Sequence, residues 1–187
     1  LLPWFTATAF LHSIIVQEKL NMLKTWNMIL VILSFLLTLC GTFLTRSGII
    51  SSVHSFAKSP IGFYFVGFLA LVLVVSVVLL VYRRSVLKTQ GEVDSFLSRE
   101  AAALLNNLVL VGAAFAVLWG TLFPLFSEWF HGTKITVSPS YFNRIMTPIG
   151  LLLLLLTGWG PMVAWRKTGA EQLKKKLLAP LALAILT

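Results

Sequence analysis

The sequence has little charge and few groups that perform chemistry inside a membrane. Of its 187 residues, 15 are Lys or Arg and six are Asp or Glu, which together make 11% of the chain. None of the six acidic residues lies deep in an apolar run, so a proton or sodium relay through carboxylates has little support. The single cysteine, Cys40, excludes a disulfide within the chain, and its place in an apolar run indicates packing.

Long apolar runs are abundant. Hydrophobic residues make up 58% of the chain, above the roughly 45–50% of soluble domains, and mean hydropathy is +0.91. About 20 apolar residues cross a bilayer. We therefore predict an all-α fold, a polytopic membrane helical bundle over residues 1–187 as one domain. Its membrane segments, about six in number, are expected at 1–17, 28–44, 61–82, 101–126, 147–165 and, truncated, from 177.

Basic residues are divided unevenly between the connections. Eleven of the fifteen lie at about 18–27, 83–100 and 166–176, and four lie at about 45–60 and 127–146. Because Lys and Arg near span ends are retained in the cytoplasm, we predict the first three connections to be cytoplasmic and the other two periplasmic. The net charge of +9 then indicates contact with lipid head groups, and a nucleic-acid partner is not expected.

Both ends of the chain resemble cuts through apolar segments. The chain opens with "LLPWFTATAF", without a basic leader or an initiator methionine, and closes with "LLAPLALAILT". We expect the chain to be a piece of a longer protein.

Two of the three histidines are candidates for function. A titratable ring inside a span, such as His12 in "FTATAFLHSIIV", is expensive in hydrocarbon and suggests a functional partner, although a hydrogen bond to a neighbouring helix is an equal alternative. His54 lies in "RSGIISSVHSF", a half-apolar connection between two spans. There it is either a solvated loop residue or a ligand to a metal in an apolar organic molecule such as haem.

Other polar residues have simpler interpretations. His131 in "EWFHGTKI" is read as a structural loop residue. Arg46, at a span end, is expected to extend to the interface or to pair with an anionic group such as a propionate. Asn106 and Asn107, inside a span, are expected to form hydrogen bonds between helices.

Four strings carry a resemblance to a known family. They are "LLPWFTATAFLHS", "GTFLTRSGIISSVHSFAKSPIG", "SREAAALLNNLVLVGAAFAVLWGTLFPL" and "SYFNR". In order, from Leu1 to about Trp165, they resemble the CcmF family of haem lyases, within the haem-handling protein superfamily. In that family a tryptophan-rich periplasmic segment, the WWD domain, ends just before a string like the one that opens this chain. The chain is therefore expected to begin just after that segment.

The resemblance implies roles for both histidines. His54, in a motif matching "SSVHSFA", would be the catalytic position and an axial ligand to the iron of a transient substrate haem at the periplasmic face. His12, in "FLHS", would be an axial ligand to a resident haem b in the membrane, whose implied role is to deliver electrons that keep the incoming iron ferrous. The second ligand of each haem lies outside this chain. Arg46 remains the candidate cofactor-binding residue for an anionic group.

The function implied by the resemblance is haem lyase activity in the bacterial inner membrane. Such a protein accepts haem from the CcmE chaperone and promotes its thioether attachment to the C-x-x-C-H motif of apocytochrome c, together with a CcmH-type thiol-handling subunit. Two other interpretations stay open, a membrane transporter of haem or another solute and a structural assembly subunit. The sequence lacks carboxylates inside its spans and lacks the pairs of spans interrupted by Gly or Pro that mark many carriers. Both observations are evidence against a transporter.

Overall fold

The computed structural model describes residues 1–46, 61–88, 98–164 and 178. Within them, the chain is helical without strands, so the predicted all-α class is confirmed. The elements are α1 (Leu2–Leu20), α2 (Lys24–Arg46), α3 (Ile61–Tyr82), α4 (Arg99–His131), α5 (Pro139–Trp159) and a 3-10 turn, η1 (Gly160–Met162).

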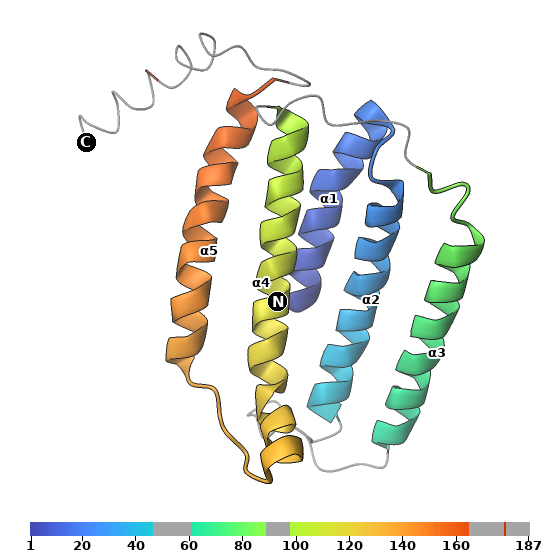
Figure 1. Ribbon diagram of the computed structural model, residues 1–187, viewed down its shortest axis with the longest axis vertical. Coiled ribbons are helices and arrows are strands. Elements are labelled where there is room, and N and C mark those ends of the chain that lie inside the picture. The colour runs from blue at the N-terminus through green and yellow to red at the C-terminus, as the bar shows by residue number, and fades with distance from the viewer. Residues whose placement is uncertain (47–60, 89–97, 165–177, 179–187) are drawn as a thin grey trace.

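The helices stand side by side in the order α3, α2, α1, α4, α5 (Figure 1). Helix α1 contacts both α2 and α4, whereas α3 contacts α2 and α5 contacts α4. Consecutive helices run in opposite directions. The first helix of the chain is thus inserted between the second and the fourth, and it forms the centre of the bundle.

The number of membrane segments differs from the expected six. Four helical segments in the described ranges are long and apolar enough to cross a membrane. They are Lys24–Arg46, Gly62–Tyr82, Arg99–His131 and Pro139–Met162. Residues 1–17 form most of α1, which is not among the four, and the segment expected from 177 lies almost wholly outside the described residues. The count of about six is therefore not confirmed.

The central position of α1 explains why it is less apolar than its neighbours. Its buried residues recur every three or four positions and include two with hydroxyl groups: Phe5, Thr6, Ala9, Ser13 and Val16. Phe5 and Ala9 join Leu30 of α2 and Leu110, Ala113 and Ala114 of α4 in one hydrophobic cluster. With its flanks packed against protein, α1 needs less apolar surface than a helix that faces lipid.

Hydrogen bonds between polar side chains join α1 to α2. The hydroxyls of Thr6 and Ser34 lie 2.7 Å apart, Ser13 donates to the Asn27 amide oxygen, and Asn27 Nδ2 donates to Gln17 Oε1 over 2.8 Å. Such bonds hold helices together in an apolar medium, where side chains have few other partners. They fix the rotation of α1 relative to α2.

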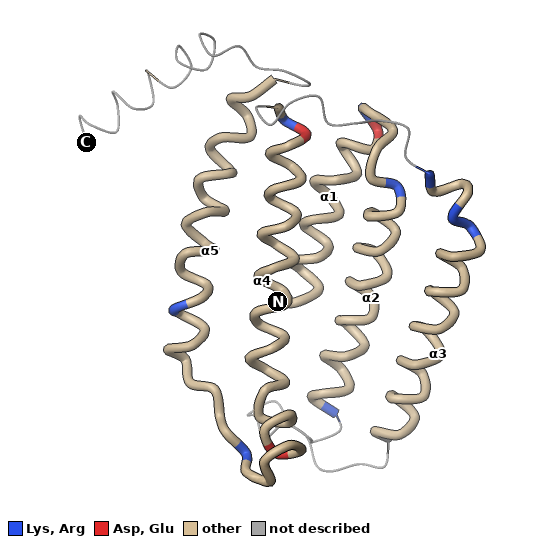
Figure 2. The backbone as a smooth tube through the Cα atoms, in the orientation of Figure 1, with Lys and Arg blue, Asp and Glu red and all other residues tan. Residues whose placement is uncertain are grey.

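Charged residues gather at the two ends of the bundle (Figure 2). The end that holds the start of α4 carries most of the described basic residues: Lys19, Lys24, Arg83, Arg84, Lys88 and Arg99. Arg46 ends α2 and Lys134 follows α4 at the other end, whereas Arg144 lies inside α5, within the candidate span Pro139–Met162. Apart from Arg144, the part of the bundle between the two charged ends is mostly apolar and suits a bilayer.

Candidate functional site

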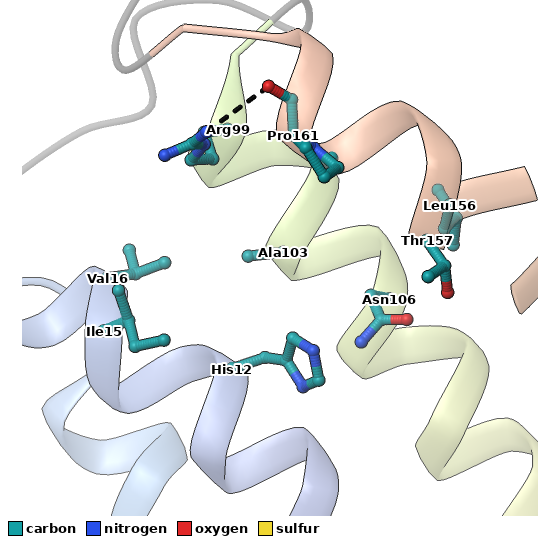
Figure 3. Close-up of a pocket in the computed structure, with 11 residues that line it drawn as sticks. His12, Ile15, Val16, Arg99, Ala103, Asn106, Leu156, Thr157 and Pro161 are labelled. Atoms are coloured by element: carbon teal, nitrogen blue, oxygen red, sulfur yellow. Dashed lines mark hydrogen bonds between the residues drawn. The ribbon is translucent and has the colours of Figure 1, made fainter. Parts of the chain in front are cut away.

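A cavity of about 420 Å³ lies between α1, α4 and the end of α5 (Figure 3). This volume falls in the range of ligand pockets, roughly 300–1,000 Å³. Apolar and small side chains dominate the lining, with a histidine, an arginine, an asparagine and a threonine among them. The lining residues are His12, Ile15, Val16, Arg99, Ala102, Ala103, Asn106, Leu156, Thr157, Gly160 and Pro161.

The imidazole of His12 extends from α1 into the space beside α4 (Figure 3). Its Nδ1 lies 2.8 Å from the carbonyl oxygen of Thr8, one turn earlier in the same helix. Because a carbonyl only accepts, Nδ1 carries the proton in this bond, and a neutral ring then has its lone pair on Nε2. Histidines that bind metals are commonly oriented in this way by a backbone carbonyl.

The rotation of α1 directs His12 to the cavity. Ser13, the next residue, is fully buried and donates to Asn27 of α2. Consecutive helical residues point about 100° apart, so the bond of Ser13 to α2 turns His12 away from α2 and toward α4. In the described part of the chain, the hydrogen bond of His12 goes to its own helix and not to a neighbouring one.

The wall opposite His12 is one face of α4. Arg99 begins the helix, and its Nη2 donates to the carbonyl of Pro161 over 3.4 Å, while its backbone N–H donates to Ala164 over 3.0 Å. Ala102 and Ala103 follow, and the half-buried Asn106 lies two turns from Arg99. These contacts join the start of α4 to η1 and shape the rim of the cavity.

The two asparagines of α4 have different surroundings. Asn106 lines the cavity, whereas Asn107 is 1% exposed, and neither atom of its side-chain amide has a hydrogen-bond partner. Neither asparagine makes the expected bond between helices to a described residue; Thr6, Ser13, Gln17, Asn27 and Ser34 make such bonds instead. Arg99 was not predicted to be a cavity residue. Its spacing of seven residues from Asn106, which places both on one face of a helix, was the available signal.

Arg46, the other predicted site residue within the described ranges, does not line this cavity. Arg46 is the last residue of α2 and is exposed at the end of the bundle opposite Arg99 (Figure 2). His131 ends α4, also toward that end, and is exposed. His54 lies outside the described residues, between Arg46 and Ile61.

The fold and the cavity define a multi-pass helical membrane protein with a histidine directed into a ligand-sized space between helices. No family model matches the chain. Among curated proteins, it is 44% identical over 180 residues to the cytochrome c-type biogenesis protein CycK of Bradyrhizobium diazoefficiens, covering 96% of the chain and 27% of that protein. It is 42% identical over 182 residues to CcmF of Pseudomonas aeruginosa, covering 97% and 28%.

A solved structure indicates the same family as the curated relatives. The chain matches a cytochrome c haem lyase CcmF with a TM-score of 0.71 and 36% identity, over 98% of the chain and 26% of that structure. The chain belongs to the CcmF family as a partial chain, which confirms the resemblance carried by the four strings. It spans about a quarter of the length of these relatives.

Proposed function

We propose that the chain is part of a haem lyase that accepts haem from the CcmE chaperone and promotes its thioether attachment to the C-x-x-C-H motif of apocytochrome c. The observation that carries this proposal is the 36% identity, over 98% of the chain, to a structure named cytochrome c haem lyase CcmF. Because the chain spans about a quarter of that protein, the activity is assigned to the whole protein. A CcmH-type subunit that handles thiols and apocytochrome is the further partner.

The proposed location is the bacterial inner membrane, with the active face periplasmic. The connections at about 18–27, 83–100 and 166–176 would be cytoplasmic, because they hold eleven of the fifteen basic residues. Helix α1 and the residues from 177 would complete a set of about six membrane segments. The alternation of helix direction supports this assignment, because it groups the ends of the helices as the charge count does (Figure 1).

His12 is the proposed axial ligand of a resident haem b. The residues of the cavity fit that group: Nδ1 of His12 is held by the Thr8 carbonyl, so Nε2 is the donor atom available to iron, and Ile15, Val16 and Leu156 supply apolar contacts. A haem with two histidine ligands supplies one-electron transfer, which here would keep substrate iron ferrous. The protein orients the ring and keeps its tautomer, and the second ligand is expected outside this chain.

His54 is the proposed catalytic residue, an axial ligand to the substrate haem. Arg46 and Ile61, which border the segment that contains His54, lie at the end of the bundle opposite the His12 cavity (Figure 1). This arrangement supports two separate haem sites on the two histidines. Arg46, exposed at the same end, is suited to pair with a propionate of the substrate.

Replacing His54 by glycine in the full-length protein tests this function. We expect loss of cytochrome c maturation with retention of the resident haem b, because the substitution removes only the ligand to the substrate. Added imidazole should partly restore maturation by filling the vacant position on iron. The measurements are haem-stained cytochrome c and the absorption spectrum of the purified protein. Normal maturation by the variant without imidazole would exclude His54 as a ligand.

A further inference from the structure

We propose that Arg99 and Asn106 are the polar anchors of the ligand in the His12 cavity, and that Arg99 binds its carboxylate arms. The inference rests on the proposed function, in which that ligand is haem b. It adds that the propionates are held at the rim where α4 begins, and that an amide deeper on the same helix forms a hydrogen bond with the ligand.

The first step concerns Arg99. Its side chain is half-buried at the rim, and the bond of Nη2 to the Pro161 carbonyl over 3.4 Å orients the guanidinium there. A guanidinium has five N–H donors, so it can keep this carbonyl and also bind a carboxylate. Arg99 is also the first residue of α4, where the helix dipole favours an anion. Glu100, the neighbouring acidic residue, is buried and does not line the cavity.

The second step concerns Asn106. Seven residues separate it from Arg99, about 10 Å along the helix axis and nearly the same angle around it. Asn106 lies within the span candidate Arg99–His131, where an amide without a hydrogen bond is costly. Its side chain lines the cavity (Figure 3), and no described residue forms a hydrogen bond with it. A ligand in the cavity is therefore the available partner.

The third step concerns the surface between the two anchors. Ala102 and Ala103 lie there, and their small side chains leave room for the edge of a ligand beside α4. The hydroxyl of Thr157 donates to the Leu153 carbonyl over 2.8 Å, so it already has an acceptor. Along this face of α4 the cavity is therefore lined by the cationic Arg99 at the rim, then by two alanines, and then by the amide of Asn106 farther inside. This order matches a flat apolar molecule with carboxylates along one edge.

The carboxylate contact is tested by offering two forms of haem. Full-length protein purified without haem is titrated with haem and with haem dimethyl ester, which lacks the charged arms. Since a hydrogen bond to a charged group contributes about 1.5–3 kcal/mol, we expect the wild type to prefer haem about tenfold or more. Arg99→Gln should lose most of that preference, Arg99→Lys should keep part of it, and Arg83→Gln should keep all of it. Arg83 has the same charge, is exposed at the same end, and does not line the cavity.

An unchanged preference in the Arg99→Gln protein would overturn the proposal and leave Arg99 to other anions such as lipid phosphates. Asn106→Ala should speed haem loss to apomyoglobin several-fold, whereas Leu105→Ala, at an exposed neighbouring position, should not. Equal rates in these two variants would remove Asn106 from the ligand site.

The spectrum of the His12→Ala protein distinguishes failure of the Arg99 assignment from failure of the proposed function. If His12→Ala keeps the low-spin haem spectrum, the haem assignment itself fails. If His12→Ala loses that spectrum while Arg99→Gln behaves as Arg83→Gln does, only the assignment of Arg99 fails.

Discussion

At the scale of the residue, the orientation of His12 depends on two bonds within the chain. The Thr8 carbonyl accepts a hydrogen bond from His12 Nδ1, and the neighbouring Ser13 donates to Asn27 of α2. The first bond selects the tautomer and the second selects the direction in which the ring faces. Both are set before any ligand binds, so the site requires little rearrangement on binding.

Replacing His12 by alanine should remove the low-spin b-type spectrum from purified full-length protein, because Nε2 is the proposed donor to iron. The polypeptide should still insert, since the ring is exposed and makes no bond to a neighbouring helix among the described residues. Absorption spectra of oxidised and reduced protein measure the effect. His131→Ala, at the end of α4, is the matched control and should leave the spectrum intact. An unchanged spectrum in the His12 variant would make His12 a packing residue.

At the scale of the element, the contact between α4 and α5 depends on a residue without a side chain. A Cβ added at Gly120 would lie 2.7 Å from Cε1 of Tyr141 and 2.8 Å from Cε1 of Phe142. Gly120 therefore lets these two rings pack against α4, and the Tyr141 hydroxyl lies 3.5 Å from the Ala116 carbonyl. This contact lies toward the end of α4 that is remote from the His12 cavity, so it joins α4 to α5 without lining the cavity.

Substituting alanine for Gly120 should lower the stability of the full-length protein by about 1–3 kcal/mol, because both rings must move. Gly112→Ala on the same helix is the control, since nothing lies within 4 Å of its added Cβ. Thermal unfolding in detergent measures the difference. Equal transition temperatures in the two variants would show that the rings adapt without cost.

At the scale of the whole molecule, the charges at the two ends of the bundle predict its orientation. Six described basic residues lie at the end with the start of α4, two lie at the other end, and Arg144 lies within the candidate span Pro139–Met162 (Figure 2). In the proposed orientation, in which connections rich in Lys and Arg stay in the cytoplasm, the His12 cavity would lie toward the cytoplasmic end and the segment with His54 would be periplasmic. A substrate that arrives from outside would thus meet His54 and not His12.

Reporter fusions test this orientation. A reporter fused after Lys88 should be active in the cytoplasm, and one fused after Ser55 should be active in the periplasm. Alkaline phosphatase and green fluorescent protein, which are active on opposite sides, provide the readout. Swapped activities would reverse the topology and separate His54 from the compartment where apocytochrome c is found.

Periodicity and hydropathy were sufficient to predict much of the fold. The all-α class follows from long apolar runs, and the expected segments 28–44, 61–82 and 101–126 lie within α2, α3 and α4. Segment 147–165 overlaps α5 and η1 but begins eight residues later than α5, because the helix continues into the polar string "SYFNR". Helix ends follow backbone hydrogen bonding and capping, as at Ser98 and Gly132, and hydropathy does not record these.

The sequence by itself determined the helical membrane class, the family and the choice of His12 as a candidate, because apolar runs and motifs are local properties of the chain. Only the tertiary structure decided what surrounds His12. Helix α1 packs between α2 and α4, and polar bonds to α2 turn its histidine toward α4. Arg99 and Asn106 lie some ninety residues from His12 in the sequence and become its neighbours only in that packing. Contacts between distant segments depend on which helices pack together, and periodicity within one helix carries no information about that choice.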